Sequence, residues 1–397
     1  MVTVPATARR SSMSVALLAM ALSAFVMGTA EFVITGLLPN VAGDLNLSIP
    51  TAGTLISGYA LAVVIGGPAC TMAGARVPRK PLLLAAMLLF VVGNLVSAVA
   101  PAYWVLMVGR VLAAFGQASF LGIGTVVAAN LVADHLRSRA IAMVFSGITL
   151  ANVAGAPLGT LLGQNLGWRT IFWIISLAAV ISLLGVAASV PPQPSPGHIG
   201  FRAELAMFGR KQVWLTLAIG MFAMGAVFAS FSYIAPLLTE VTELSSAAIT
   251  PMLALFGVGL VAGNLLGGWA ADRAQLPTLG GALGLLTVVM LVFAALSHQP
   301  VAVAIGLVLT GAAGFAVIPA FLARLINLAG GESPLSAATG GSASNMGIAA
   351  GAYLGGLTIQ AGFGYVAPTW LGAVLAALGL GAVLAVVVSR TPVANTV

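Results

Sequence analysis

Residues 14–38 read SVALLAMALSAFVMGTAEFVITGLL, a run of 25 residues in which Glu31 is the only charged side chain. A helix that crosses the apolar core of a bilayer, which is about 30 Å thick, needs roughly 20 such residues. The stretch therefore predicts a transmembrane helix. Arg9-Arg10 before it and Gly28-Thr29-Ala30 within it also fit a cleavable secretory signal, but the apolar sequence continues through Leu38, which favours a retained helix.

The remaining chain has the same character. Of its 397 residues 60% are hydrophobic and 6% charged, whereas roughly a quarter of a soluble protein is charged. The other predicted spans are 51–73, 81–100, 102–126, 140–163, 170–190, 212–238, 249–270, 279–297, 301–325, 337–360 and 367–389. The sequence thus predicts an all-α membrane protein with twelve transmembrane helices.

The chain also matches itself at an offset of about 197 residues. Met27-Gly28 aligns with Met224-Gly225, and Arg76 aligns with Arg273. This repeat predicts two pseudo-symmetric six-helix bundles, an architecture typical of secondary transporters that rock around a central site. The predicted parts are a tail at 1–13, a bundle at 14–190, a linker at 191–211, a second bundle at 212–389 and a tail at 390–397.

Basic residues in the loops predict the orientation, because loops rich in Arg and Lys stay in the cytoplasm. On the side of the predicted termini lie Arg9, Arg10, Arg76, Arg79, Lys80, Arg137, Arg139, Arg202, Arg210, Lys211, Arg273, Arg324 and Arg390. Arg169 alone lies opposite. Both termini and the linker are therefore expected in the cytoplasm, and the chain is expected in the inner (cytoplasmic) membrane as a multi-pass protein. The scattered basic residues form no nucleic-acid-binding patch.

Glycines spaced four residues apart predict close helix packing. In a bilayer such van der Waals packing drives helix association, because the hydrophobic effect does not act between helices in lipid. The sets are Gly155/Gly159/Gly163, Gly263/Gly267 and Gly351/Gly355.

Once Arg324 and the other basic residues above are assigned to the loops, two charged residues remain inside the predicted spans, Glu31 and Arg110. Each costs about 2.5–3.5 kcal/mol to insert, and both lie roughly 10–12 Å from the outer ends of their helices, where they could pair. At the 197-residue offset their counterparts are the uncharged Phe228 and Leu307. An ion pair needed only to hold such a bundle would be expected in both halves, so the asymmetry favours a function, with a purely structural pair as the alternative. A carboxylate facing a cavity can carry protons across the membrane.

Several motifs resemble the major facilitator superfamily, and within it the twelve-helix drug:proton antiporters of the sugar-efflux and chloramphenicol-export branch. Gly28-Thr29-Ala30-Glu31-Phe32 looks like that branch's acidic first helix, and Leu38 to Leu45 looks like the segment that follows it. Gly268-Trp269-Ala270-Ala271-Asp272-Arg273 is similar to the family's cytoplasmic gate motif, and Asn152 to Gly159 resembles the fifth-helix antiporter motif. Arg110 matches the family's fourth-helix arginine.

The same motifs depart from the family at several positions. In the first-half gate loop, Ala75 replaces the usual Asp and Pro78 the usual Gly, which leaves Arg76, Arg79 and Lys80. Ala113-Ala114 replaces the Gln-Gly that commonly follows the arginine, and Ala156 separates the usual Gly-Pro pair. The resemblance assigns gating to Arg76, Arg79, Asp272, Arg273, Gly155, Pro157 and Gly159. Gly167-Trp168-Arg169 is frequent in the family and carries little functional information.

Candidate substrate contacts are few. One set lies at helical spacing on a single predicted span: Met224, Phe228 and Phe231, with Tyr233 beyond them. This pattern is typical of an apolar, adaptable substrate pocket, but also of ordinary core packing. Gln117 lies two turns from Arg110 on the same helix face and is the best polar candidate. Tyr59, Asn152 and Asn345 are further polar candidates.

These features predict a proton-coupled exporter of small amphipathic compounds, such as drugs or antibiotics. It is expected to work by alternating access and as a monomer. Its partners are the solute, protons and the lipid bilayer. Efflux or uptake of a sugar or another small solute is the alternative, because Glu31 serves a symporter equally well. An enzyme would need a nucleophile–base pair or metal cluster, which the spans lack, and no cofactor or metal is expected. A receptor that transports nothing is a further alternative, which measured solute flux would exclude.

Overall fold

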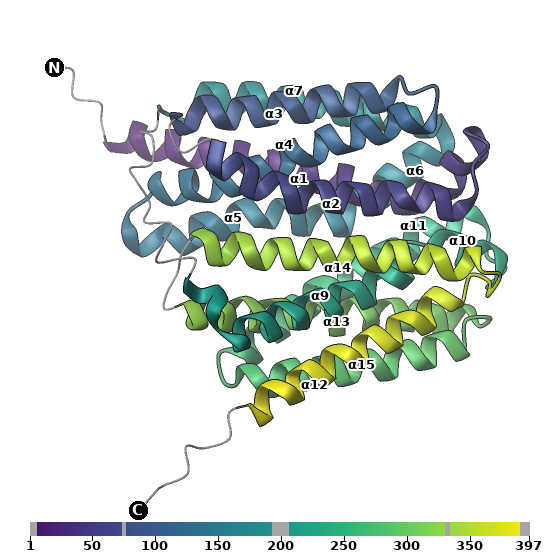
Figure 1. The fold of residues 1–397 in the computed structure, drawn as a ribbon. Coiled ribbons are helices and arrows are strands. Elements are labelled where there is room, and N and C mark those ends of the chain that lie inside the picture. Colours follow the sequence, from purple (N-terminus) through teal and green to yellow (C-terminus); the bar gives the residue numbers. More distant parts are fainter. Residues whose placement is uncertain (1–5, 74–76, 193–205, 330–333, 390–397) are drawn as a thin grey trace, which may run out of the picture. The chain divides into compact units, whose positions relative to one another are not determined.

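The computed structural model describes residues 6–73, 77–192, 206–329 and 334–389, and these residues form a series of helices (Figure 1). The first part of the chain contains α1 (Ala6–Asp44), α2 (Ile49–Ala73), α3 (Arg79–Ala98), α4 (Tyr103–Asn130), η2 (Asp134–Leu136), α5 (Arg137–Leu150), η3 (Ala151–Gly155), α6 (Ala156–Leu166) and α7 (Trp168–Ser189). The second contains η4 (Ala206–Gly209), α9 (Lys211–Phe231), α10 (Ile234–Glu240), η5 (Ser246–Ala248), α11 (Ile249–Ala271), α12 (Gln275–Ala295), α13 (Pro300–Ala329), α14 (Pro334–Gln360) and α15 (Ala367–Val388).

Each of the twelve predicted spans corresponds to a helical segment whose ends lie within a few residues of the prediction, apart from the longer start of α1. Two segments are interrupted: α5, η3 and α6 together form one, and α9 with α10 forms another. Among the described residues, eleven segments are long and apolar enough to cross a membrane. The exception is α14, in which Gly, Ser and Asn replace much of the aliphatic content.

The chain divides into two compact units, residues 1–199 with 249–254 and residues 200–248 with 255–397. Within the first unit, α1 packs against α5 and α7, and α3 packs against α4 and α7. Within the second, α9 packs against α14 and α15, and α12 packs against α13 and α15. The pairs correspond one to one along the two halves, as the internal sequence repeat predicts.

Glycine brings helix backbones into contact in both units, as predicted. In the first unit, a Cβ added at Gly155 would overlap the side chain of Thr29 on α1, and one at Gly159 would lie 2.8 Å from Val33. In the second, a Cβ at Gly351 on α14 would lie 2.8 Å from the Cα of Gly225 on α9. An added side chain would have to displace a neighbouring side chain at Gly155 and Gly159 and the backbone of α9 at Gly351, so these glycines set how closely α1 and α9 pack against their neighbours.

The interruption after α5 is a single turn of π-helix, η3. Its closing bond runs from the backbone N–H of Ala156 to the carbonyl of Ala151, five residues earlier. Pro157 directly follows, has no N–H and would clash with the carbonyl of Val153 in a regular helix. A widened turn relieves that clash and lets the helix continue into α6.

Candidate functional site

The first unit brings four of the predicted residues together from three helices. Arg110 on α4 donates from Nη1 to the carbonyl of Ala30 at 2.5 Å and from Nη2 to the carbonyl of Glu31 at 3.2 Å, both on α1. Gln117 on α4 donates from Nε2 to Oε2 of Glu31 at 2.5 Å. The hydroxyl of Tyr59 on α2 donates to Oε1 of Gln117 at 2.5 Å. We call Glu31, Tyr59, Arg110 and Gln117 the buried polar cluster.

Arg110 therefore contacts the backbone of Glu31 and not its carboxylate, although the sequence suggested a side-chain pair. Short loops join α1 through α4, so α4 runs antiparallel to α1. Side chains on a helix tilt toward its N-terminus and carbonyls point toward its C-terminus. The Glu31 side chain consequently points along α1 toward the level of Gln117, while the carbonyls of Ala30 and Glu31 point toward the level of Arg110.

The burial within the cluster is uneven. Arg110 is fully buried, with its guanidinium 4.1 Å above the ring of Tyr59, a distance that gives a favourable cation–π contact. Its Nε has no hydrogen-bond partner among the residues the structure describes. Glu31 is half-buried, so the cluster anchors the cation more deeply than the acid. This arrangement holds the acid inside a span while leaving it partly accessible.

The aromatic candidates on α9 lie in the packed interior of the second unit. Phe231 stacks on Phe256 of α11 with ring centroids 3.8 Å apart, and it meets Phe228 edge to face at 5.8 Å. Met224 and Phe228 are buried. The hydroxyl of Tyr233 donates to the carbonyl of Ala352 on α14 at 2.8 Å. In this structure these side chains hold α9 in place, which is the packing role that the sequence left open.

The two asparagine candidates make local contacts. Asn152, inside η3, donates to the carbonyl of Ile148 at 3.0 Å, and Asn345 on α14 donates to the carbonyl of Gly341 at 3.1 Å. The Oδ1 atom of Asn345 is buried and lacks a partner among the described residues. Within the first unit, the structure does not bring Asn152 to the buried polar cluster, and Asn345 belongs to the second unit.

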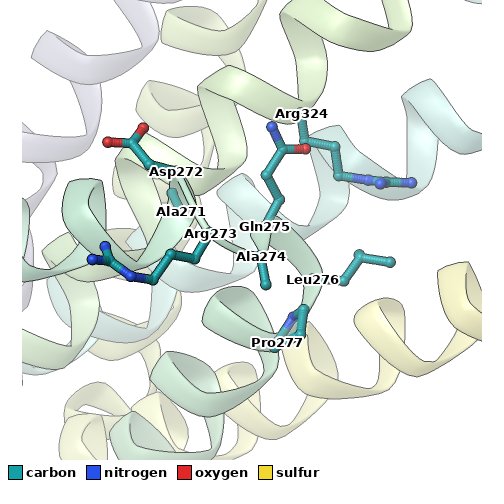
Figure 2. Close-up of a pocket in the computed structure, with 8 residues that line it drawn as sticks. All are labelled: Ala271, Asp272, Arg273, Ala274, Gln275, Leu276, Pro277 and Arg324. Carbon is teal, nitrogen blue, oxygen red and sulfur yellow. The ribbon is translucent and has the colours of Figure 1, made fainter.

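The described charged gate residues, Arg79, Asp272 and Arg273, lie at helix ends. Figure 2 shows a pocket lined by residues 271–277 and Arg324, with the side chains of Asp272 and Arg273 extending to one side of it. Arg273 donates to the carbonyl of Trp269 at 2.7 Å, and its guanidinium lies 3.7 Å from the centre of that indole. Arg79 begins α3. Arg76 and the substituted Ala75 lie outside the described residues.

A cluster at the opposite helix ends was not recognised from the sequence. Asp44, the last residue of α1, accepts hydrogen bonds at Oδ2 from Arg169 Nη1 at 2.5 Å and from Trp168 Nε1 at 3.2 Å. Arg169 also donates to the carbonyl of Ala100, from Nε at 3.1 Å and Nη2 at 2.8 Å. The motif judged uninformative thus joins α1, the α3–α4 loop and α7. The signal was available, because Arg169 is the one basic residue predicted on its side of the membrane.

Among the described residues, eleven apolar spans lie in two similarly packed units, and a half-buried acid and a buried arginine meet inside the first; these features define the chain as a secondary transporter of small molecules. The chain belongs to the Major Facilitator Superfamily, whose sequence profile matches residues 20–340. It is a multi-pass inner-membrane transporter and not an enzyme.

Curated relatives match nearly the whole chain. The inner membrane transport protein YdhP of Escherichia coli strain K12 is 40% identical over 364 residues, which cover 92% of this chain and 94% of that protein. The chloramphenicol resistance protein of Streptomyces lividans is 34% identical over 365 residues, covering 91% and 93%. The predicted resemblance to this family is therefore confirmed.

A solved structure supports the fold. The crystal structure of the peptide transporter POT aligns with a TM-score of 0.73 at 14% sequence identity and covers 94% of this chain and 93% of that one. At this identity the likeness concerns the fold alone.

Proposed function

We propose that this transporter exports small amphipathic compounds in exchange for protons, and that Glu31 carries the proton. The observation that supports this proposal is the carboxylate of Glu31 inside a membrane span, hydrogen-bonded to the neutral amide of Gln117 and not ion-paired with Arg110. A direct Arg–carboxylate pair would hold the acid in its ionised form. A carboxylate that is bonded to an amide and partly exposed is better suited to exchange a proton.

The energy of one proton suffices for useful export. One charge moving inward across 100 mV releases about 2.3 kcal/mol, which supports roughly a 50-fold gradient of an uncharged solute. Glu31 is protonated when the site opens outward and releases the proton when the site opens inward. The solute binds to the deprotonated, inward-open protein and is released outside as the proton binds.

The substrate class follows from composition and from one relative. Few hydrogen-bonding side chains lie within the spans, which favours apolar or amphipathic solutes over sugars. The Streptomyces lividans relative is named for resistance to chloramphenicol, a compact amphipathic antibiotic. We therefore place chloramphenicol first among the compounds to test. We also propose that the protein acts as a monomer and that both termini lie in the cytoplasm.

Alternating access would use the close glycine contacts between α1 and the α5–η3–α6 segment. Gly155 and Gly159 hold that segment against the part of α1 that carries Glu31, and Pro157 sets its widened turn. Movement of the segment would therefore move Glu31 directly. The charged loops that hold Arg79, Asp272 and Arg273 would gate the cytoplasmic side.

The test is proton and solute flux in liposomes that contain the purified protein, with chloramphenicol and a panel of amphipathic dyes. Antiport predicts that an imposed proton gradient drives solute in the opposite direction, and that Glu31→Gln abolishes the coupling while solute still binds. Glu240→Gln, at the end of α10, is the matched control and should leave coupling intact. Movement of proton and solute in the same direction would identify an uptake symporter, and normal coupling in Glu31→Gln would refute the role of Glu31.

A further inference from the structure

The connection between Tyr59 and Gln117 has no role in the function proposed above. Both side chains are buried, with 1% and 3% of their surface exposed, and they lie on different helices, α2 and α4. Their hydrogen bond leaves the Tyr59 hydroxyl directed at Gln117 and the Gln117 amide directed at Glu31. Two buried polar groups on separate helices thus form a single chain of bonds that ends at the carboxylate.

The order of these bonds fixes the orientation of the amide. The Tyr59 hydroxyl donates to Oε1 of Gln117, and the donor Nε2 of the same amide faces Glu31. With the amide turned around, Oε1 would face a carboxylate oxygen, and two acceptors would repel each other. The ionised carboxylate therefore selects the orientation in which Nε2 faces it, and the bond from the Tyr59 hydroxyl to Oε1 holds the amide in that orientation.

Arg110 is engaged elsewhere. Its two terminal nitrogens donate to the carbonyls of Ala30 and Glu31, and its guanidinium lies over the Tyr59 ring. The hydrogen bond that reaches the carboxylate comes from Gln117. The side chain that donates a hydrogen bond to the negatively charged carboxylate of Glu31 is therefore the amide of Gln117.

We propose that Gln117, held in orientation by Tyr59, is the positioning residue that sets the pH at which Glu31 exchanges its proton. This inference rests on the proposed role of Glu31 as the proton carrier. Protonation forms an O–H bond between Oε1 of Glu31 and a proton delivered from water, while Oε2 continues to accept from Gln117. No bond of the Tyr59–Gln117 connection has to break during the cycle.

Other ionisable groups on the helices packed against α1 lie farther along those helices. Tyr59 on α2 and Arg110 on α4 are already members of the cluster. Among the side chains that the structure describes, the remaining ones are Tyr103 at the start of α4, Arg137 and Arg139 at the start of α5, and Arg169 at the start of α7. The cluster is therefore the local environment that the acid senses.

Infrared difference spectroscopy during a pH titration of the protein in liposomes tests the proposal without a known substrate. The carboxylic-acid band that disappears in Glu31→Gln reports the protonation of Glu31. Gln117→Met keeps the volume but removes the donor, and the midpoint of that band should move to higher pH by about one unit, because the ionised form loses a charge-assisted hydrogen bond. Tyr59→Phe keeps the ring over Arg110 and should move the midpoint in the same direction by a smaller amount.

The double variant and a control decide how Tyr59 acts. If Tyr59 acts through Gln117, adding Tyr59→Phe to Gln117→Met produces no further shift. Tyr103→Phe removes a hydroxyl that bonds Thr54 between the same two helices at 2.6 Å, and it should leave the midpoint unchanged. An unmoved or lowered midpoint in Gln117→Met would overturn the proposal, as would additive shifts in the double variant.

Failure of this inference is distinguishable from failure of the proposed function. If Glu31→Gln still couples proton and solute flux, the proposed function fails, while the titration still measures the effect of Gln117 on the acid. If coupling depends on Glu31 but the titration midpoint is the same in Gln117→Met and Tyr59→Phe as in the wild type, the proposed function stands and the positioning role is refuted. A band that Glu31→Gln does not remove means that Glu31 takes up no proton in this range, which overturns both.

Discussion

Replacing Gly351 by alanine tests whether backbone contact between α9 and α14 holds the second unit together. The added Cβ would lie 2.8 Å from the Cα and 2.9 Å from the carbonyl carbon of Gly225. Carbon atoms in contact normally lie about 3.5–4.0 Å apart, so the two backbones must separate locally by roughly 1 Å. Overpacking of this kind costs about 1–3 kcal/mol, and it exceeds the 0.5–1 kcal/mol that alanine gains over glycine in a helix.

Gly341 on the same helix provides the matched control, because a Cβ there meets nothing within 4 Å. Gly341→Ala should therefore be neutral or stabilising, and the two variants should differ by about 1–3 kcal/mol, because the helix-propensity gain is common to both. In thermal unfolding of the detergent-solubilised protein this difference corresponds to roughly 1–4 °C, because an unfolding entropy of about 2.1 cal/mol/K per residue amounts to roughly 0.8 kcal/mol/K for 397 residues. Gly155→Ala should cost less than Gly351→Ala, since its nearest neighbour is the side chain of Thr29, which can rotate. A Gly351→Ala protein that unfolds at or above the temperature of Gly341→Ala would refute the reasoning.

Two further predictions concern a buried hydroxyl and the orientation. Tyr233→Phe removes the bond to the Ala352 carbonyl and should lower stability by about 1–2 kcal/mol in the same unfolding assay, whereas Tyr353→Phe, at a side chain that is 51% exposed, should not. In a Cys70→Ser background, Ser48→Cys should react with a membrane-impermeant maleimide in intact cells and Ala274→Cys only after lysis, because the loop arginines predict these opposite sides. Reversed labelling would refute the predicted orientation.

The spans and the repeat were predictable because each depends on a property that the sequence carries locally. Bilayer thickness sets the length of every span, and the paired packing of α1 with α5 and of α9 with α14 follows from glycines that recur at one offset. The widened turn η3 was not predicted. The sequence showed Pro157 one residue later than in the family pattern. Whether a helix ends, bends or widens at a proline depends on the residues packed around it.

The buried polar cluster shows a second limit of prediction from the sequence. Depth along each helix placed Glu31 and Arg110 at one level, and Gln117 two turns away on the Arg110 face, but depth measures Cα positions. A side chain of Glu31's length can reach either neighbour. The tilt of side chains toward the N-terminus of α1, combined with the antiparallel direction of α4, carries the carboxylate to Gln117 and leaves the backbone carbonyls for Arg110. Helix direction was known from the topology, so the same argument applied to the sequence would have chosen Gln117 over Arg110 as the partner of the acid.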